Sequence, residues 1–167
     1  MRKLSLCLLI GLLGSHSEGH AETFGGLPVP GGERVAIVHA EGAQVYECRR
    51  DLTNALSWQF REPVATLVDQ GKTVGRHYVG PSWELADGTV ITGKVVVQAP
   101  GATKADIPLL MLWVNTAKGH GLLAHARTVL RINTKGGVAA GACQNAGELL
   151  SVPYSADYAF FQAVRDN

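Results

Sequence analysis

Residues 71–93, with the sequence GKTVGRHYVGPSWELADGTVITG, decide the fold. The dipeptides Gln70-Gly71 and Asp87-Gly88 each separate two short runs of strand-forming residues. Asp-Gly between such runs is a strong local signal for a β-hairpin. After this turn, Ile91, Gly93, Val95 and Val97 alternate with more polar positions and form the apolar face of a half-buried strand. The segment therefore predicts antiparallel hairpins built from residues 65–69, 72–79, 82–86 and 89–98.

Similar short runs occur on both sides of this stretch. Further strands are predicted at 34–39, 43–49, 57–61 and 109–115, with closing segments at 152–154 and 158–164. Gly42 is expected to break the first pair, Pro63 to end the third strand, and residues 51–56 to form one helical turn capped by Asp51. About eight to ten short strands at regular spacing are typical of an all-β domain. We expect a single-domain antiparallel β-sandwich or closed β-barrel with few or no helices.

Residues 122–133 (LLAHARTVLRIN) fit either a strand or a helix, and their β-branched residues favour a strand. The strand would direct Leu122, Ala124, Ala126, Leu130 and Ile132 inward. It would direct Leu123, His125, Arg127, Arg131 and Asn133 outward, where the two arginines could hold a carboxylate.

The first 21 residues have the layout of a secretory signal peptide. Arg2 and Lys3 precede an apolar run over residues 4–13, and Gly19 and Ala21 supply the small residues of a cleavage site. That run is about ten residues, half of the roughly twenty that a membrane-spanning helix needs. We expect an exported protein, periplasmic or extracellular and not integral to a membrane, with one β domain over residues 22–167.

The charge of this domain excludes one class of partner. The chain has 15 Lys+Arg and 14 Asp+Glu, and these become equal in number once Arg2, Lys3 and Glu18 are removed. A neutral chain without a basic run lacks the electrostatic footprint of a nucleic-acid-binding protein. We expect no nucleic acid partner.

Two cysteines, Cys48 and Cys143, remain after removal of the signal peptide. In an exported protein such a pair favours a disulfide, while a free thiol pair and a metal site are the alternatives. Neither a CxxC motif nor histidines at ligand spacing accompany them, so no metal site is expected. No GxGxxG motif follows a strand and opens a helix, and no cofactor is expected.

The candidate ligand-binding residues lie in residues 71–93: His77, Tyr78, Trp83 and Glu84. Aromatic rings stack on apolar ligand faces and carboxylates fix hydroxyl groups, which would suit a carbohydrate. His77 and Glu84 could also form an acid/base pair. A purely structural role, with Trp83 and Tyr78 in the core and His77 hydrogen-bonded, is the alternative for this group. Asp87 is expected to serve the turn.

Several motifs together resemble the domain-of-unknown-function 3455 family, whose members are exported proteins of bacteria and fungi. They include QVYEC, WxF, VGRHYVGPSWELADGT, RINTKGG with a following cysteine, and VPYSADYAFF, spread over residues 27–161. The resemblance implies an exported protein, but it brings no activity, cofactor or catalytic residue.

Two functions follow as hypotheses. The first is a non-catalytic ligand- or partner-binding β domain, whose partner would be a small molecule, a glycan or a protein. The alternative is a carbohydrate-active hydrolase or lyase that uses a His/carboxylate pair, and it requires paired carboxylates across a pocket. No GxSxG nucleophile motif is present, and the catalytic residues stay unknown.

Overall fold

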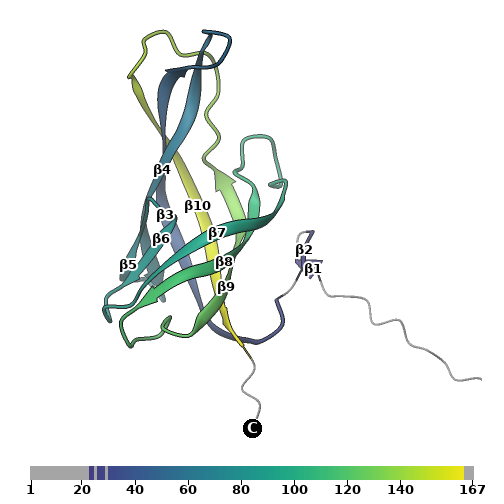
Figure 1. Ribbon diagram of the computed structural model, residues 1–167, viewed down its shortest axis with the longest axis vertical. Helices are drawn as coiled ribbons and strands as arrows, with labels where there is room; N and C mark the ends of the chain where they lie inside the picture. Colours follow the sequence, from purple (N-terminus) through teal and green to yellow (C-terminus); the bar gives the residue numbers. More distant parts are fainter. Residues whose placement is uncertain (1–22, 25, 29, 164–167) are drawn as a thin grey trace, which may run out of the picture.

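The protein is an eight-stranded antiparallel β-barrel (Figure 1). The computed structural model describes residues 23–24, 26–28 and 30–163, so the expected signal peptide lies outside the described residues. The described chain contains no helix, which confirms the all-β prediction and decides for the barrel over the sandwich. The strands are β1 Thr23–Phe24, β2 Leu27–Pro28, β3 Glu33–Arg50, β4 Leu56–Asp69, β5 Lys72–Tyr78, β6 Ser82–Leu85, β7 Val90–Ala99, β8 Leu109–Lys118, β9 Ala126–Gly136 and β10 Leu149–Gln162.

Each barrel strand pairs with the next one along the chain, and β10 closes the barrel by pairing with both β9 and β3. The two predicted hairpins are present, between β4 and β5 and between β6 and β7. At the first, Gln70 and Gly71 both have positive φ angles, 46° and 76°. Such values suit the tight turns that match the twist of a hairpin.

The strands are longer than predicted, because Gly42 does not break the chain. β3 runs through it without interruption, and Gly42 pairs with Ala65 on β4 and with Tyr154 on β10. A Cβ atom at this position would overlap the carbonyl oxygen of Val64 and the backbone of Ala65. The glycine therefore permits a close approach of two strands, which is a second role of glycine inside a strand.

Pro63 does not end a strand either. It lies within β4, opposite Gln44, next to a bulge at which Arg61 has no partner on β3. Proline lacks the N–H that a regular ladder needs, and a bulge is one of the few places in a sheet that tolerates it. The predicted strands 152–154 and 158–164 likewise merge into β10, which ends at Gln162.

One other prediction of local structure was wrong, and the strand predicted over residues 122–133 is confirmed only from Ala126. Residues 51–55 form a turn instead of a helix, and Leu56 already belongs to β4. In this turn Asp51 accepts hydrogen bonds from the backbone of Thr53 and Ala55. Residues 122–125 also form a turn, so only residues from Ala126 onward make a strand. The backbone N–H of Leu122 donates to Asp87 Oδ2 at 2.7 Å, which ties this turn to the β6–β7 hairpin.

The barrel has apolar contacts on both sides of its wall. Inside, fully buried side chains from many strands form the main core; the largest are Trp83, Leu112, Val129, Tyr158 and Phe160. Outside, a smaller cluster gathers around Leu27 of β2 and consists of Leu27, Leu130, Ile132, Ala159 and Phe161. The N-terminal segment therefore covers one outer patch of β9 and β10.

At one end of the barrel, at the top of Figure 1, three segments reach beyond its body. They are the last residues of β3, the first residues of β4 and the loop between β9 and β10. A disulfide bond joins Cys48 at the end of β3 to Cys143 in that loop, as predicted. Backbone hydrogen bonds from Cys48 N to Glu148 O and from Gly147 N to Cys48 O support the same connection. This end of the barrel, where β5 and β7 also terminate, is called the open end below.

Candidate functional site: a pocket at the open end of the barrel

A pocket of about 650 Å³ lies inside the barrel at its open end. An eight-stranded barrel has an interior that side chains can fill or that can hold one small ligand. Here the side chains leave part of it free. The pocket is lined by Gln44, Tyr46, Phe60, Arg61, Pro63, His77, Val79, Gly80, Pro81, Trp83, Val95, Gln98, Ile107, Pro108, Leu110, Leu112, Arg131 and Tyr158.

Three rings, those of His77, Trp83 and Tyr158, pack together in this lining. His77 and Trp83 are cross-strand partners on β5 and β6, and their rings stack with centroids 4.8 Å apart and planes 18° from parallel. Tyr158 of β10 lies 4.8 Å from the His77 ring and 5.3 Å from the Trp83 ring. Phe160 then packs edge-on against Trp83, further down β10. The three rings form what we call the aromatic floor of the pocket.

His77 is held neutral in this floor. Its Nδ1 lies 2.8 Å from the carbonyl oxygen of Ser82, which can only accept, so Nδ1 carries the proton. Burial lowers the pKa of His77 to about 4, and the cation of Arg131 acts in the same direction, whereas the bond to Ser82 opposes it. At neutral pH the Nε2 atom is therefore a hydrogen-bond acceptor.

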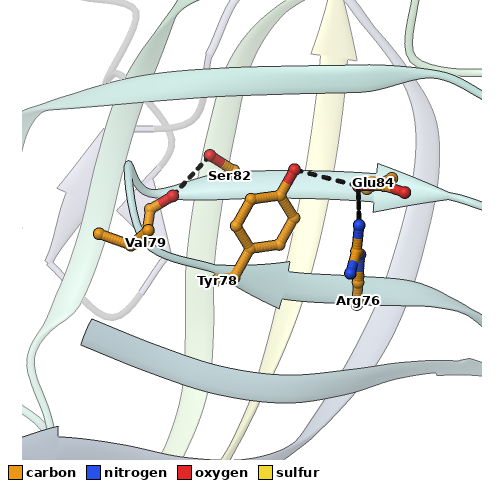
Figure 2. A network of polar contacts seen from close by, with 5 residues as sticks. All are labelled: Arg76, Tyr78, Val79, Ser82 and Glu84. Carbon is orange, nitrogen blue, oxygen red and sulfur yellow. Dashed lines mark hydrogen bonds and ion pairs between the residues drawn. The ribbon is translucent and has the colours of Figure 1, made fainter.

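Tyr78 and Glu84 do not join this floor. They lie with Arg76 on the opposite face of the β5–β6 hairpin (Figure 2). Glu84 Oε2 accepts hydrogen bonds from Arg76 Nη2 at 2.8 Å and from the Tyr78 hydroxyl at 3.0 Å. These two bonds lower the pKa of Glu84, while the Arg76 guanidinium also lies 5.0 Å from the centre of the Tyr78 ring.

The sequence-based group of candidates is thus divided by strand geometry. Neighbouring residues on a strand point to opposite faces, so His77 and Trp83 share the inner face while Tyr78 and Glu84 share the outer one. His77 and Glu84 cannot form the acid/base pair that the enzymatic hypothesis requires. Ser82 does not form a nucleophile–base pair with His77 either, because the Ser82 hydroxyl donates to the carbonyl of Val79 at 2.7 Å (Figure 2). His77 instead binds the backbone carbonyl of Ser82.

Asp87 serves the turn in the structure. Its Oδ1 accepts a bond from the backbone of Thr89 at 2.8 Å and its Oδ2 accepts one from Leu122 at 2.7 Å. Partial burial would raise the pKa of Asp87, but these bonds outweigh it and the pKa is lowered. The turn lies at the end of β6, away from the start of that strand where the pocket is.

The sequence singled out Arg131 as one of two arginines that could hold a carboxylate. It placed this residue on the outer face of β9 with Arg127 and Asn133, but Arg131 lines the pocket. Its cross-strand partners Leu110 and Tyr158 both belong to the inner core, and partners across a ladder share a face.

The neighbours of Arg131 explain the error. Leu130 and Ile132 looked like core residues, and they are buried, but under Leu27 on the outside of the barrel. Both faces of β9 are therefore buried at this point, and apolar alternation cannot distinguish them. The apolar residues in the N-terminal segment were the one sequence signal that an outer patch would be covered.

The open end also exposes apolar side chains. Phe60 is 52% exposed, Val79 54% and Val95 43%, and all three line the pocket. The predicted apolar face of β7 holds as far as Val95, which pairs with the core residue Leu112 and lines the pocket. The bulge at Val96 then turns Val97 to the outer face, where it pairs with Met111. Phe60, Val79 and Val95 thus form an apolar rim around the pocket entrance.

The histidines and acids of the barrel do not gather into a metal site. Within the described ranges no three His, Cys, Asp or Glu side chains lie close enough together to hold a metal ion. His39, for example, contacts Asp157 at 2.7 Å on the outside of the barrel. The part of the chain with described structure contains no helix long and apolar enough to cross a membrane.

A family model described as "Protein of unknown function (DUF3455)" matches residues 29–162. No curated protein and no solved structure matches the chain.

Proposed function

Because the chain belongs to the DUF3455 family of proteins of unknown function, we propose a function from its pocket: non-catalytic binding of one small, largely apolar molecule inside the barrel. The observation that carries this proposal is the pocket of about 650 Å³ above the aromatic floor. Sites for small molecules are typically mostly apolar hollows of about 300–1,000 Å³ with a few polar groups.

The lining favours an apolar ligand over a glycan. A sugar would need carboxylates or amides to hold its hydroxyl groups, in addition to a flat ring for stacking. The lining holds two amides, Gln44 and Gln98, but no aspartate or glutamate, and most of its residues are aromatic, aliphatic or proline. The hydrolase or lyase hypothesis also loses its named acid/base pair, because His77 and Glu84 lie on opposite faces.

The rim supports entry from solvent. Exposed Phe60, Val79 and Val95 surround the entrance and present apolar surface to a ligand before it reaches the floor. The disulfide bond at the same end supports an exported location, since such bonds persist in oxidising compartments. A ligand-binding barrel outside the cytoplasm is the function that these features support best.

Titration with the neutral fluorescent probe N-phenyl-1-naphthylamine tests the proposal. The probe should bind the parent protein at one site and raise its melting temperature. Val95→Trp, which introduces an indole at the pocket entrance, should weaken binding at least tenfold. Val64→Trp is the matched control, because Val64 is 54% exposed and does not line the pocket. Equal binding by the two variants, or no binding by the parent, would contradict the proposal.

A further inference from the structure

Arg131 is a cation in a pocket whose lining is mostly apolar. Its Nε donates to the carbonyl oxygen of Pro108 at 3.1 Å, which fixes the base of the guanidinium. Among the described residues no carboxylate lies within the 4.0 Å of an ion pair with Arg131. Arg61, the other arginine of the lining, does have such a partner in Glu62 at 3.1 Å.

A guanidinium keeps its charge at all ordinary pH values, so it cannot become neutral on burial as a lysine can. Placing a charge among apolar groups is unfavourable unless an opposite charge pairs with it. Since the lining of the pocket contains no acid, the protein itself supplies no such charge there. An anion that enters the pocket would supply the missing opposite charge, and only the anion would still have to lose its hydration, because Arg131 is already partly removed from water.

The field of Arg131 reaches the groups around the pocket. Burial raises the pKa of Tyr158, Tyr154 and Tyr46, and the Arg131 cation opposes that rise in all three. At His77, burial lowers the pKa and Arg131 lowers it further. One cation therefore acts on aromatic side chains from β3, β5 and β10.

The buried polar atoms near it include donors that are not fully hydrogen-bonded. Within the described residues, Trp83 Nε1 is a buried donor without a hydrogen-bond partner. Gln44 Nε2 and the Tyr158 hydroxyl are also buried and have only weak contacts, to Tyr154 and, for Tyr158, to Arg131 as well. All three residues line the pocket together with Arg131. An ionised carboxylate is an acceptor with about four lone-pair positions, so it complements such a set of donors.

We propose that Arg131 binds the carboxylate of an apolar carboxylic acid, aromatic or aliphatic, whose hydrocarbon body lies between the aromatic floor and the rim. This inference rests on the proposed binding function and names the class of its ligand. A carboxylate fits better than a phosphate, because a single unpaired arginine matches a single negative charge. The guanidinium can receive it through two parallel N–H···O bonds.

The test compares 2-naphthoate with its neutral isostere 2-naphthamide by isothermal titration calorimetry. The parent protein should bind the naphthoate at least tenfold more tightly. Arg131→Gln should abolish that preference while binding of 2-naphthamide and N-phenyl-1-naphthylamine persists. Arg127→Gln makes the same change of charge at an exposed position of β9 outside the pocket lining, and it should keep the preference.

The outcomes separate this inference from the proposed function. Equal affinity of the parent for the two naphthalenes, or a preference that survives in Arg131→Gln, would overturn the role of Arg131 and leave the binding function standing. Failure of all three compounds to bind the parent would overturn both. Arg131→Lys provides a second variant if the glutamine protein does not fold, and it should keep a reduced preference because it retains the charge without the planar fork. An undiminished preference in the lysine variant would show that the fork plays no part.

Discussion

His77 stacks on Trp83 across the β5–β6 ladder, with ring centroids 4.8 Å apart, and neither side chain has more than 2% of its surface exposed. This pair connects the architecture of the barrel to its pocket. Its imidazole is bonded to the Ser82 carbonyl on one side and lines the pocket on the other. Any change of charge on His77 therefore acts on the fold and on the site together.

Stability should fall in mild acid because of His77. Its pKa is about 4 in the folded protein, against the ordinary value of 6.5 in an unfolded chain, so the unfolded chain binds more protons between these values. The stabilisation is complete above pH 6.5 and is lost as the pH falls toward 4. The full loss is about 3 kcal/mol, at about 1.4 kcal/mol per pH unit. Urea unfolding at pH 7.5 and pH 5 measures this dependence.

His77→Phe is the variant that isolates this effect, since it keeps an aromatic ring in the floor without a titrating group. Its unfolding free energy should depend less on pH between 7.5 and 5 than that of the parent. His125→Gln removes an exposed histidine instead and should keep the parental dependence. If His77→Phe and the parent show the same dependence, His77 is not buried in the neutral form.

The outer trio of Arg76, Tyr78 and Glu84 should matter little for either stability or binding. Arg76 and Glu84 form an exposed pair, and such pairs contribute about 0.2–1 kcal/mol. Glu84→Gln and Tyr78→Phe should therefore leave the affinity for N-phenyl-1-naphthylamine unchanged. Fluorescence titration checks this, and a tenfold loss of affinity in either variant would show that the outer face of the hairpin takes part in binding.

Replacement of Gly42 by alanine should destabilise the barrel. The new Cβ would overlap the Val64 carbonyl and the Ala65 backbone, which β4 can relieve only by moving away from β3. Overpacking of this kind typically costs about 1–3 kcal/mol. Gly31→Ala serves as the control, because a Cβ there meets no atom within 4 Å. Thermal melts that shift equally in both variants would contradict the close approach at Gly42.

The Cys48–Cys143 bond should supply a large share of the stability. It closes a loop with a sequence separation of 95, for which the chain-entropy treatment gives about 4–5 kcal/mol. Chemical denaturation of the parent with and without reductant measures this contribution. The double variant Cys48→Ser/Cys143→Ser should match the reduced parent, and a difference of less than about 1 kcal/mol between oxidised and reduced protein would refute the expected size of the effect.

The sequence predicted the class of the fold because the local signals agreed with it. The turns at Gln70-Gly71 and Asp87-Gly88 and the pairing of the two cysteines needed no tertiary information. Strand lengths were underestimated because Gly42 and Pro63 look like breaks until the neighbouring strands are known. Gly42 is tolerated within β3 because it lets β4 approach closely, and Pro63 is tolerated within β4 because a bulge lies beside it. Both features depend on residues that are distant in the sequence.

The sequence identified part of the pocket. The hairpin with His77 and Trp83 was identified correctly. Because side chains alternate along each strand, however, Tyr78 and Glu84 lie on the outer face and not in the pocket. The inward direction of Arg131 could not be found from β9 alone, because Leu130 and Ile132 beside it are buried under Leu27 on the outer surface. When both faces of a strand are buried, its own sequence does not show which face an arginine occupies. That requires knowing which other segment covers the outer face, here the one with Leu27.

The most direct test of the pocket is the amide NMR spectrum of ¹⁵N-labelled protein titrated with 2-naphthoate. The chain has three tryptophans, and each gives one indole N–H signal that a Trp→Phe variant assigns. Trp83 lines the pocket, whereas Trp113 is 59% exposed and does not line it. We predict a saturable shift of the Trp83 signal with that of Trp113 unmoved. A static Trp83 signal while the Trp113 signal shifts would contradict binding inside the barrel.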